Sequence, residues 1–283
     1  MSGRFKRIFI IADIEGSSGC WSYRGSSFMT KDWARACLEM TRDVQAVVQA
    51  FFDNGVETIR IKDFHRIGYN LLPELIDSRS EILHGYRAGP VPGMGDPGDA
   101  EAVIFLGMHA ASGTDGFLAH TLTSRVDLVE VNGDPLAEIQ LFASSLAPWG
   151  LKPIFFSGCP VACKQAKARI HNISVFPIDK SVGQQQFDVA TWRSGLQQAA
   201  VKALANNLTA PYEPEGPMRV VVKMRAGSIA ARKIARRWGL DRRDDHIVID
   251  AADIHDVYML SLIHISEPTR PILVSRMPSS AGK

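Results

Sequence analysis

Two acidic side chains lie one residue apart directly after an apolar run near the start of the chain. The run "IFIIA", residues 8–12, has the pattern of a buried β-strand, and Asp13 and Glu15 follow it. Two like charges at the end of a buried strand repel one another and lose hydration, so one should take up a proton unless a cation lies nearby. The pattern therefore indicates a positively charged group at this point.

Histidines follow two further predicted strands. The second strand pattern ends at Asp63 and is followed by His65, and the strand "VIFLGM" is followed by His109. Because sites in parallel α/β proteins form outside the carboxyl ends of the strands, we expect these side chains to converge with those at the first strand end.

Glu138 adds a third carboxylate, in the first turn of a helix predicted from about Pro135. Two histidines and three carboxylates form the nitrogen and oxygen mixture that suits zinc or manganese. A pair of metal ions would resolve the repulsion at the first strand, because a carboxylate such as Asp13 can bridge two ions while Glu15 binds one of them.

Each of these residues also has a structural interpretation when it is taken alone. Asp13 could cap the turn after its strand, Glu138 could complement a helix N-terminus, and either histidine could be a hydrogen-bonded structural residue. Their coincidence at successive strand ends favours a metal site without excluding these readings.

The loop "HAASGTDGFLAHT", residues 109–121, contains another histidine. Gly113 and Gly116 give the loop the freedom to wrap around a site, and His120 lies at its far end. There His120 could act as a general acid or base or stabilise an oxyanion. The alternative is a histidine packed against the backbone of its own loop.

These residues need a scaffold, and the hydrophobic pattern predicts one. Short β-branched runs alternate with helical patterns, with strands at residues 7–12, 56–62, 102–108, 127–133 and 153–157 and a first helix at residues 31–54. This alternation predicts an α/β fold with a mainly parallel sheet flanked by helices. We expect a single domain over residues 1–259.

A connector interrupts this pattern in the last third of the chain. Residues 206–217, "NNLTAPYEPEGP", are rich in Pro, Gly and Asn, and they precede the strand "RVVVKM", a helix from about Ile229 and the strand "HIVIDA". The later elements could form a smaller C-terminal α/β subdomain with its boundary in the connector, or extend the first sheet.

The composition excludes several classes of protein. With 283 residues, 46% hydrophobic content and a net charge of +2, the chain is typical of globular proteins and gives no case for a nucleic-acid or membrane partner. We see no signal segment and no apolar run of the roughly 18 residues that a membrane span needs. Four scattered cysteines suit a reducing compartment, so we expect a cytoplasmic protein.

Four motifs in order resemble those of one enzyme family. "ADIEGSSG", "KDFH", "GMHAASGTDGFLAHT" and "VNGDPLAEIQL" are similar to the binuclear zinc D-aminopeptidases of the dipeptide-transport protein A type. The resemblance extends from about residue 7 to at least Ser157, and more weakly to about Met259. Three positions near the expected pocket depart from the family pattern: Phe64 replaces a usual Ser, Ala137 replaces a commoner Gly, and Cys159 replaces an expected Asp.

The resemblance implies the roles of six residues. Asp13 would bridge two zinc ions, His120 would be the catalytic residue, and the remaining ligands would be Glu15, His65, His109 and Glu138. It also implies a homo-oligomer, in the family a ring-like decamer whose sites face an internal channel.

The function predicted on this basis is zinc-dependent hydrolysis of short peptides or amides with an N-terminal D-amino acid, by a metal-activated water. A metal-dependent phosphohydrolase is one alternative, because "ADIEG" is similar to Asp-x-Asp motifs, but it leaves His65, His109 and Glu138 without a role. A non-catalytic peptide-binding or scaffold member of the family is another.

The last residues of the chain are predicted to be foreign to the protein. Residues 260–270, "LSLIHISEPTR", resemble the translation of a transposon-based sequencing-library adapter, and residues 275–281, "SRMPSSA", resemble its distal part. We therefore expect the native reading frame to be lost after about Met259, and we exclude residues 260–283 from the fold.

Overall fold

The computed structural model of the chain describes residues 5–87 and 89–258. Its main sheet has six parallel strands in the order β3-β2-β1-β4-β7-β8. They are β1 (Arg7–Ala12), β2 (Thr58–Asp63), β3 (Glu81–Leu83), β4 (Ala102–Met108), β7 (Lys152–Gly158) and β8 (Ser174–Pro177). The predicted fold class, a mainly parallel α/β sheet flanked by helices, is confirmed.

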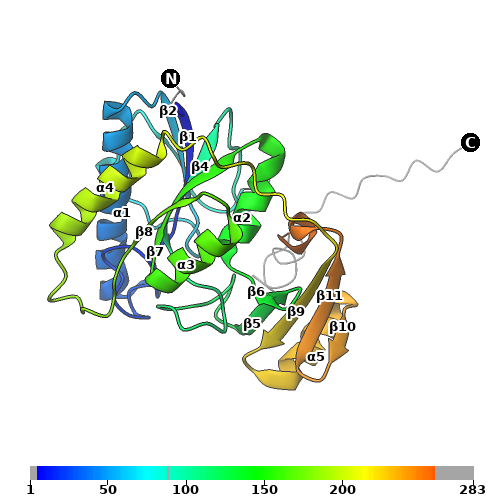
Figure 1. Cartoon of the computed structure of the whole chain (residues 1–283). Coiled ribbons are helices and arrows are strands. Elements are labelled where there is room, and N and C mark those ends of the chain that lie inside the picture. Colours follow the sequence, from blue (N-terminus) through cyan, green and yellow to red (C-terminus); the bar gives the residue numbers. More distant parts are fainter. Residues whose placement is uncertain (1–4, 88, 259–283) are drawn as a thin grey trace, which may run out of the picture.

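Helices cover both faces of this sheet (Figure 1). They are α1 (Lys31–Asp53) and α4 (Val189–Ala203) on one face, and α2 (Glu138–Leu146) and α3 (Pro160–Arg169) on the other, with short 3₁₀ turns η1 (Pro73–Leu75) and η2 (Ala147–Trp149). Successive residues of β1 alternate between the two cores: Ile8 and Ile10 pack with α1 and α4, and Phe9 and Ile11 pack on the opposite face. This is why β1 reads as a continuous apolar run.

The first helix begins and ends where its sequence predicts. Thr30 caps it, because its Oγ1 accepts a hydrogen bond of 3.0 Å from the Trp33 amide. The helix ends at Asp53, and Gly55 follows with a φ of 85°, a left-handed conformation that glycine adopts without strain. A buried stripe that includes Val44, Val48 and Phe51 faces the sheet.

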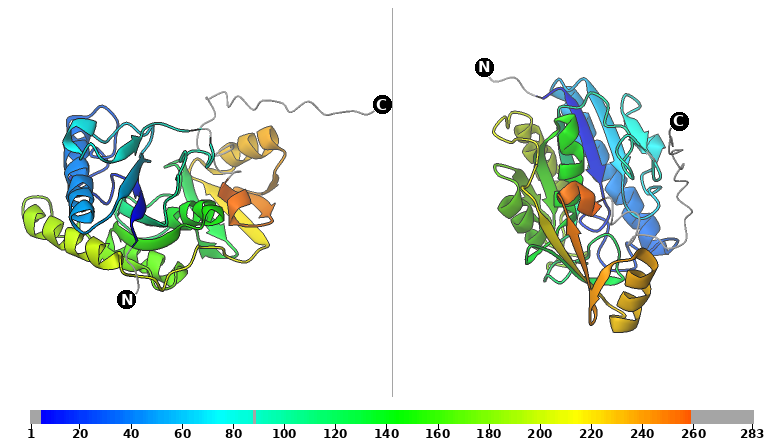
Figure 2. Two further views of the ribbon diagram at one scale, coloured as in Figure 1. Left: turned by 90° about the horizontal axis from the view of Figure 1, so that it is seen from above. Right: turned by 90° about the vertical axis from the view of Figure 1, so that its right-hand side faces the viewer.

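A second, antiparallel sheet packs beside the first (Figures 1 and 2). Its order is β10-β11-β9-β5-β6, with strands β5 (Val126–Val131), β6 (Asp134–Pro135), β9 (Met218–Met224), β10 (Asp241–Arg243) and β11 (His246–Ala251), and α5 (Gly227–Trp238) packs on it. The smaller unit is therefore not built from the C-terminal segment alone, because β5 and β6 come from the middle of the chain. Strand β5 belongs to this sheet because it pairs antiparallel with β9, and β6 belongs to it because it pairs with β5.

The segment between α4 and β9 crosses from one sheet to the other without helix or strand over residues 204–217. After β11, residues 254–258 begin a helical turn, and the buried Tyr258 donates a hydrogen bond of 2.7 Å to the carbonyl of Pro92. The predicted foreign tail, residues 260–283, lies outside the described residues. Within the described part of the chain, no helix is both long enough and apolar enough to cross a membrane.

Candidate metal centre

Asp13 lies between two histidines that come from different strand ends. Its Oδ1 is 3.1 Å from Nδ1 of His65, and its Oδ2 is 3.4 Å from Nε2 of His109. Each carboxylate oxygen therefore faces a different imidazole, and Asp13 is buried at the junction.

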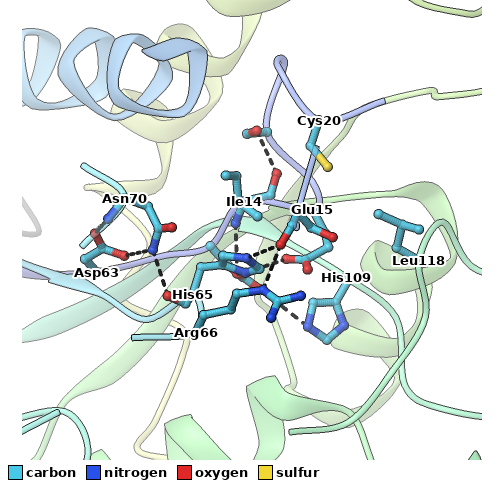
Figure 3. A network of polar contacts seen from close by, with 12 residues as sticks. Ile14, Glu15, Cys20, Asp63, His65, Arg66, Asn70, His109 and Leu118 are labelled. Atoms are coloured by element: carbon cyan, nitrogen blue, oxygen red, sulfur yellow. Dashed lines mark hydrogen bonds and ion pairs between the residues drawn. The ribbon is translucent and has the colours of Figure 1, made fainter. Parts of the chain in front are cut away.

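Two other carboxylates complete the two sides of this junction. Glu15 Oε2 is 3.2 Å from His65 Nδ1, and Glu138 Oε1 is 3.5 Å from His109 Nε2. The candidate ligand atoms fall into two groups, each with its atoms within 4.8 Å of one another: Asp13 with Glu15 and His65, and His109 with His120 and Glu138. Figure 3 shows Glu15, His65 and His109 gathered at one point.

Sheet topology explains this convergence. Strands β2, β1 and β4 are neighbours in the sheet and run parallel, so their carboxyl ends, which carry His65, Asp13 and His109, lie side by side. The loop after β1 crosses β4 closely: a Cβ at Gly107, whose φ is 73°, would lie 2.1 Å from the carbonyl oxygen of Asp13. Only glycine fits there, because any side chain would displace the backbone of the first ligand.

The loop after β1 is held from two helices. Asp43 on α1 accepts hydrogen bonds from the amide and hydroxyl of Ser18, at 2.7 and 2.8 Å, and Arg193 on α4 donates to Asp43 at 2.8 Å. Lys180 donates to the carbonyls of Ser17 and Cys20. The position of Glu15 is thus fixed by packing of the loop against both helices.

The loop after β2 is built around the buried Asp63. Its Oδ2 accepts hydrogen bonds from the amides of Asn70 (2.5 Å) and Leu71 (2.8 Å), and its Oδ1 accepts one from the Asn70 side chain (2.8 Å). The side-chain amide of Asn70 also donates a hydrogen bond of 2.7 Å to the carbonyl oxygen of His65. Burial raises the pKa of Asp63, but its hydrogen bonds, from His84 above all, outweigh this and hold the pKa below its ordinary value.

Each of the three candidate histidines has one ring nitrogen within hydrogen-bond distance of a backbone carbonyl oxygen. His65 Nε2 lies 3.0 Å from Ser26 O, His109 Nδ1 lies 3.1 Å from Ala110 O, and His120 Nδ1 lies 2.9 Å from Leu118 O. A carbonyl only accepts, so in the neutral imidazole this nitrogen carries the proton and the other has a free lone pair. In His65 and His109 that lone pair faces carboxylate oxygens, an arrangement that is repulsive unless a cation lies between them.

His120 stacks on His109, with ring centroids 3.8 Å apart and planes inclined by 14°. Its Nδ1 is the ring nitrogen that faces a backbone carbonyl, and His120 lines the same cavity as the other five candidate residues. The structure brings all six predicted residues into one pocket.

Comparison with known proteins gives the family. A family model described as D-aminopeptidase matches residues 6–262 of the chain. The chain belongs to the D-aminopeptidase family. The resemblance predicted from the motifs is confirmed.

Two relatives set the limits of this comparison. The D-aminopeptidase of Bacillus subtilis (strain 168) is 22% identical over 180 residues, which is 63% of this chain and 65% of that protein, so the match spans just under two thirds of the relative. The structure of the Zn-dependent D-aminopeptidase DppA from Bacillus subtilis, a self-compartmentalizing protease, has a TM-score of 0.81 at 20% identity. It covers 91% of this chain and 96% of that one, which shows a common fold.

The electrostatics of this family member's pocket fit a divalent metal. Burial, and then the charge of Glu15, raises the pKa of Asp13 to about 7. Burial lowers the pKa of His65, but the charge of Glu15 and hydrogen bonds to both carboxylates raise it well above its ordinary value. Glu15 Oε2 is buried against the same imidazole, 3.2 Å from His65 Nδ1. Burial raises the pKa of Glu15 and Glu138, but the charges of His65 and His109 outweigh it and hold both values below the ordinary range. These buried carboxylates thus stay charged only beside a positive neighbour, and imidazole with carboxylate is the donor set of zinc or manganese.

The site opens into a cavity of about 750 Å³. Besides the six candidate residues, its walls carry four aromatic side chains, from Tyr23, Phe28, Phe64 and Tyr86, and two arginines, Arg66 and Arg225. The departure at Phe64 is thus a pocket residue, and it packs on Phe142 with centroids 4.3 Å apart. Cys159 is the N-cap residue of α3 without a side-chain cap hydrogen bond, and it is buried behind Gly116 of the lining and does not itself line the cavity.

Sequence reasoning missed Arg66 and the segment that contains Tyr23 and Ser26. Arg66 directly follows a candidate ligand, which was the available signal, and its φ of 49° is left-handed, a conformation that costs about 1 kcal/mol or more for a residue other than glycine. Residues 13–30 contain no helix or strand, so periodicity gives no sign of their contribution.

Proposed function

We propose that the chain is a zinc-dependent aminopeptidase that hydrolyses short peptides or amides with an N-terminal D-amino acid. The observation that carries this proposal is the position of Asp13, which presents one oxygen to each of two groups of ligand atoms. The family membership and the zinc-dependent structural relative support it.

The proposed centre holds two zinc ions. Asp13 would be the shared ligand, Glu15 and His65 would hold one ion, and His109 and Glu138 would hold the other. When bound, zinc supplies Lewis-acid chemistry, since it activates water and polarises a carbonyl oxygen. The chain contributes the orientation of the ligands, because the backbone carbonyls of Ser26 and Ala110 fix the imidazole rings.

His120 is the proposed catalytic residue. Burial, and then the neighbouring His109, lowers the pKa of His120, which keeps its imidazole neutral at neutral pH. Because Nδ1 donates to the carbonyl of Leu118, Nε2 is the nitrogen that accepts a proton from the attacking water and passes it to the leaving amine. This chemistry needs no serine or cysteine nucleophile, and the buried Cys159 has no place in it.

We further propose a homo-oligomer, with the decamer implied by the family as the specific expectation, to be measured by light scattering coupled to size-exclusion chromatography. The self-compartmentalizing relative supports assembly of this kind. The four cysteines are all free, which supports the proposed cytoplasmic location.

A hydrolysis panel tests the function. Protein stripped of metal and then titrated with zinc is assayed on matched D- and L-amino-acid amides and dipeptides, and zinc retained after dialysis is measured. We expect about two zinc per chain and hydrolysis that depends on them. Asp13→Ala should lose the bound zinc and the hydrolysis. Asp53 is an exposed carboxylate at the end of α1, and Asp53→Ala should retain the zinc and the hydrolysis.

The same panel rejects the alternatives. Release of phosphate from phosphomonoesters without peptide hydrolysis would favour a phosphohydrolase, an interpretation that the structure does not favour because His65, His109 and Glu138 all join the site. Zinc binding without any turnover would indicate a peptide-binding member. Turnover in Asp13→Ala equal to that of wild type would refute the shared-ligand assignment.

A further inference from the structure

Arg66 occupies an unusual position at the mouth of the pocket. It directly follows the ligand residue His65, its backbone is left-handed, with a φ of 49°, and its side chain lines the cavity. The hydrogen bonds of Asp63 and Asn70 hold the two ends of this loop, so the strained conformation persists. Strain of this kind, held by its surroundings, is typical of functional positions.

One hydrogen bond ties the guanidinium of Arg66 to the metal centre. Its Nε donates to the carbonyl oxygen of Ser26 at 2.8 Å, and the same oxygen lies 3.0 Å from Nε2 of His65. The two side chains therefore meet at one acceptor, and Figure 3 shows Arg66 beside His65. This contact fixes the direction of the guanidinium through Nε, and within the described residues its two terminal nitrogens donate no hydrogen bond.

The other arginine of the pocket differs in this respect. Arg225 donates to the carbonyl of Ser124 at 3.0 Å, and its Nη1 lies 3.6 Å from Asp127. Within the described part of the chain, no carboxylate forms an ion pair with Arg66. Arg66, which is exposed, thus brings to the cavity wall planar N–H donors and a positive charge that no described carboxylate pairs with.

We propose that Arg66 binds the C-terminal carboxylate of the substrate and so makes the enzyme select dipeptides over their neutral amides. This inference rests on the proposed aminopeptidase function. A carboxylate is the partner that a guanidinium binds with two parallel hydrogen bonds. In a dipeptide the terminal carboxylate lies one residue beyond the scissile bond, and adjacent Cα atoms are about 3.8 Å apart, so the contact requires a cation close to the ligands.

The geometry also limits the length of the substrate. Each additional residue moves the terminal carboxylate up to about 3.5 Å farther from the scissile bond. A guanidinium fixed beside His65 therefore pairs with the carboxylate of a dipeptide, and longer peptides lose this interaction.

The test compares two substrates that differ only in charge, D-alanylglycine and D-alanylglycinamide. Arg66→Gln should raise KM and lower kcat/KM for the dipeptide about ten- to hundredfold, the range of a charge-assisted hydrogen bond, and change the amide by less than about twofold. Arg66→Lys should restore part of the preference. Arg225→Gln, the matched control, should leave the ratio of the two substrates as in wild type.

A binding measurement separates this inference from the proposed function. Calorimetry of D-alanylglycine and its amide is carried out with zinc-loaded His120→Ala protein, with and without Arg66→Gln. Weaker binding of the dipeptide alone supports the role of Arg66 even if wild type fails to hydrolyse either substrate, a failure that refutes only the proposed function. Equal losses for both ligands, or no loss, would overturn the inference.

Discussion

His120 has its Nδ1 fixed by the carbonyl of Leu118 and its ring stacked on His109. We expect His120→Ala to retain its zinc and to lose about 10²- to 10⁴-fold in kcat, the range of a general acid or base. Its lowered pKa leaves the nitrogen Nε2 unprotonated at neutral pH, so activity in wild type should fall as the pH drops and His120 gains a proton. Zinc content and single-turnover kinetics measure the two effects.

The control for this variant is Glu138→Ala, which removes a proposed ligand on the same side of the site and should lose metal. If His120→Ala loses zinc to the same extent, His120 is a ligand, as its distance from His109 and Glu138 also permits.

At the scale of residues, sequence reasoning finds side chains by type and misses contacts made through the backbone. Five of the candidate residues are histidines and carboxylates at predicted strand and helix ends, and His120 ends the glycine-containing loop of residues 109–121, which is why the sequence indicates all six. The carbonyls of Ser26, Ala110 and Leu118, which orient the imidazoles, belong to residues of unremarkable type. The sequence does not indicate Arg66 for a similar reason. What distinguishes Arg66 is its left-handed backbone angle and the lack of an acidic partner within the described residues, and neither can be seen in its residue type.

The loop after β2 is stabilised by one buried carboxylate, Asp63. We expect Asp63→Ala to weaken zinc affinity about 10- to 100-fold, as loss of a residue that supports a ligand does, because the amides of Asn70 and Leu71 lose their acceptor and His65 loses its fixed position. Competition with a chromogenic chelator measures the affinity.

Asp77→Ala is the matched control, since Asp77 pairs with the exposed Arg79 and contacts none of the candidate ligands in the described ion pairs. Equal zinc affinity in wild type and Asp63→Ala would show that the loop keeps His65 in place without this carboxylate.

The buried Lys62 on β2 makes the free energy of unfolding depend on pH. Burial lowers its pKa from 10.5 to about 8, and its ammonium donates to the carbonyls of Leu83 and Gly85. Between pH 8 and 10.5 the unfolded chain holds a proton on Lys62 that the folded chain has released, so the contribution of Lys62 to the free energy of unfolding rises with pH. Relative to Lys62→Met, wild type should gain on the order of 1 to 3 kcal/mol over this interval.

Urea unfolding of both proteins at several pH values measures this difference. A difference that stays constant from pH 8 to 10.5, or that favours the variant as the pH rises, would contradict the prediction.

At the scale of elements, the sequence predicts the bounds of strands with continuous apolar patterns correctly, but it does not predict the second, antiparallel sheet. The predicted strands at residues 7–12 and 102–108 agree with β1 and β4 to the residue, because both are buried on their two faces. The sequence pattern predicts β5 as part of the parallel alternation, yet β5 pairs antiparallel with β9. Local periodicity identifies a strand but does not identify a partner so distant in the sequence.

At the scale of the whole molecule, all six candidate residues and their described contacts lie before Met259. We expect a variant that ends at residue 259 to bind zinc and turn over substrate as the full chain does, since residues 260–283 are predicted to be foreign and carry no site residue. Zinc content and kcat/KM of the two proteins measure this. A genomic read that continues "LSLIHISEPTR" in frame, or loss of zinc in the shorter variant, would contradict it.

The pairing of β5 with β9 has a consequence for how the protein is made. The loop that carries His109 and His120 leads into β5, and Glu138 follows β6, so this side of the site is framed by a strand whose partner, β9, is incomplete until residue 224 has been synthesised. At translation rates of about 5 to 20 residues per second, β9 leaves the ribosome roughly ten seconds after His109. During that interval Asp13, Glu15 and His65 already have their own strands, β1 and β2. Nascent chains stalled before β9 should therefore retain a single zinc ion, and the second ion should enter only after release.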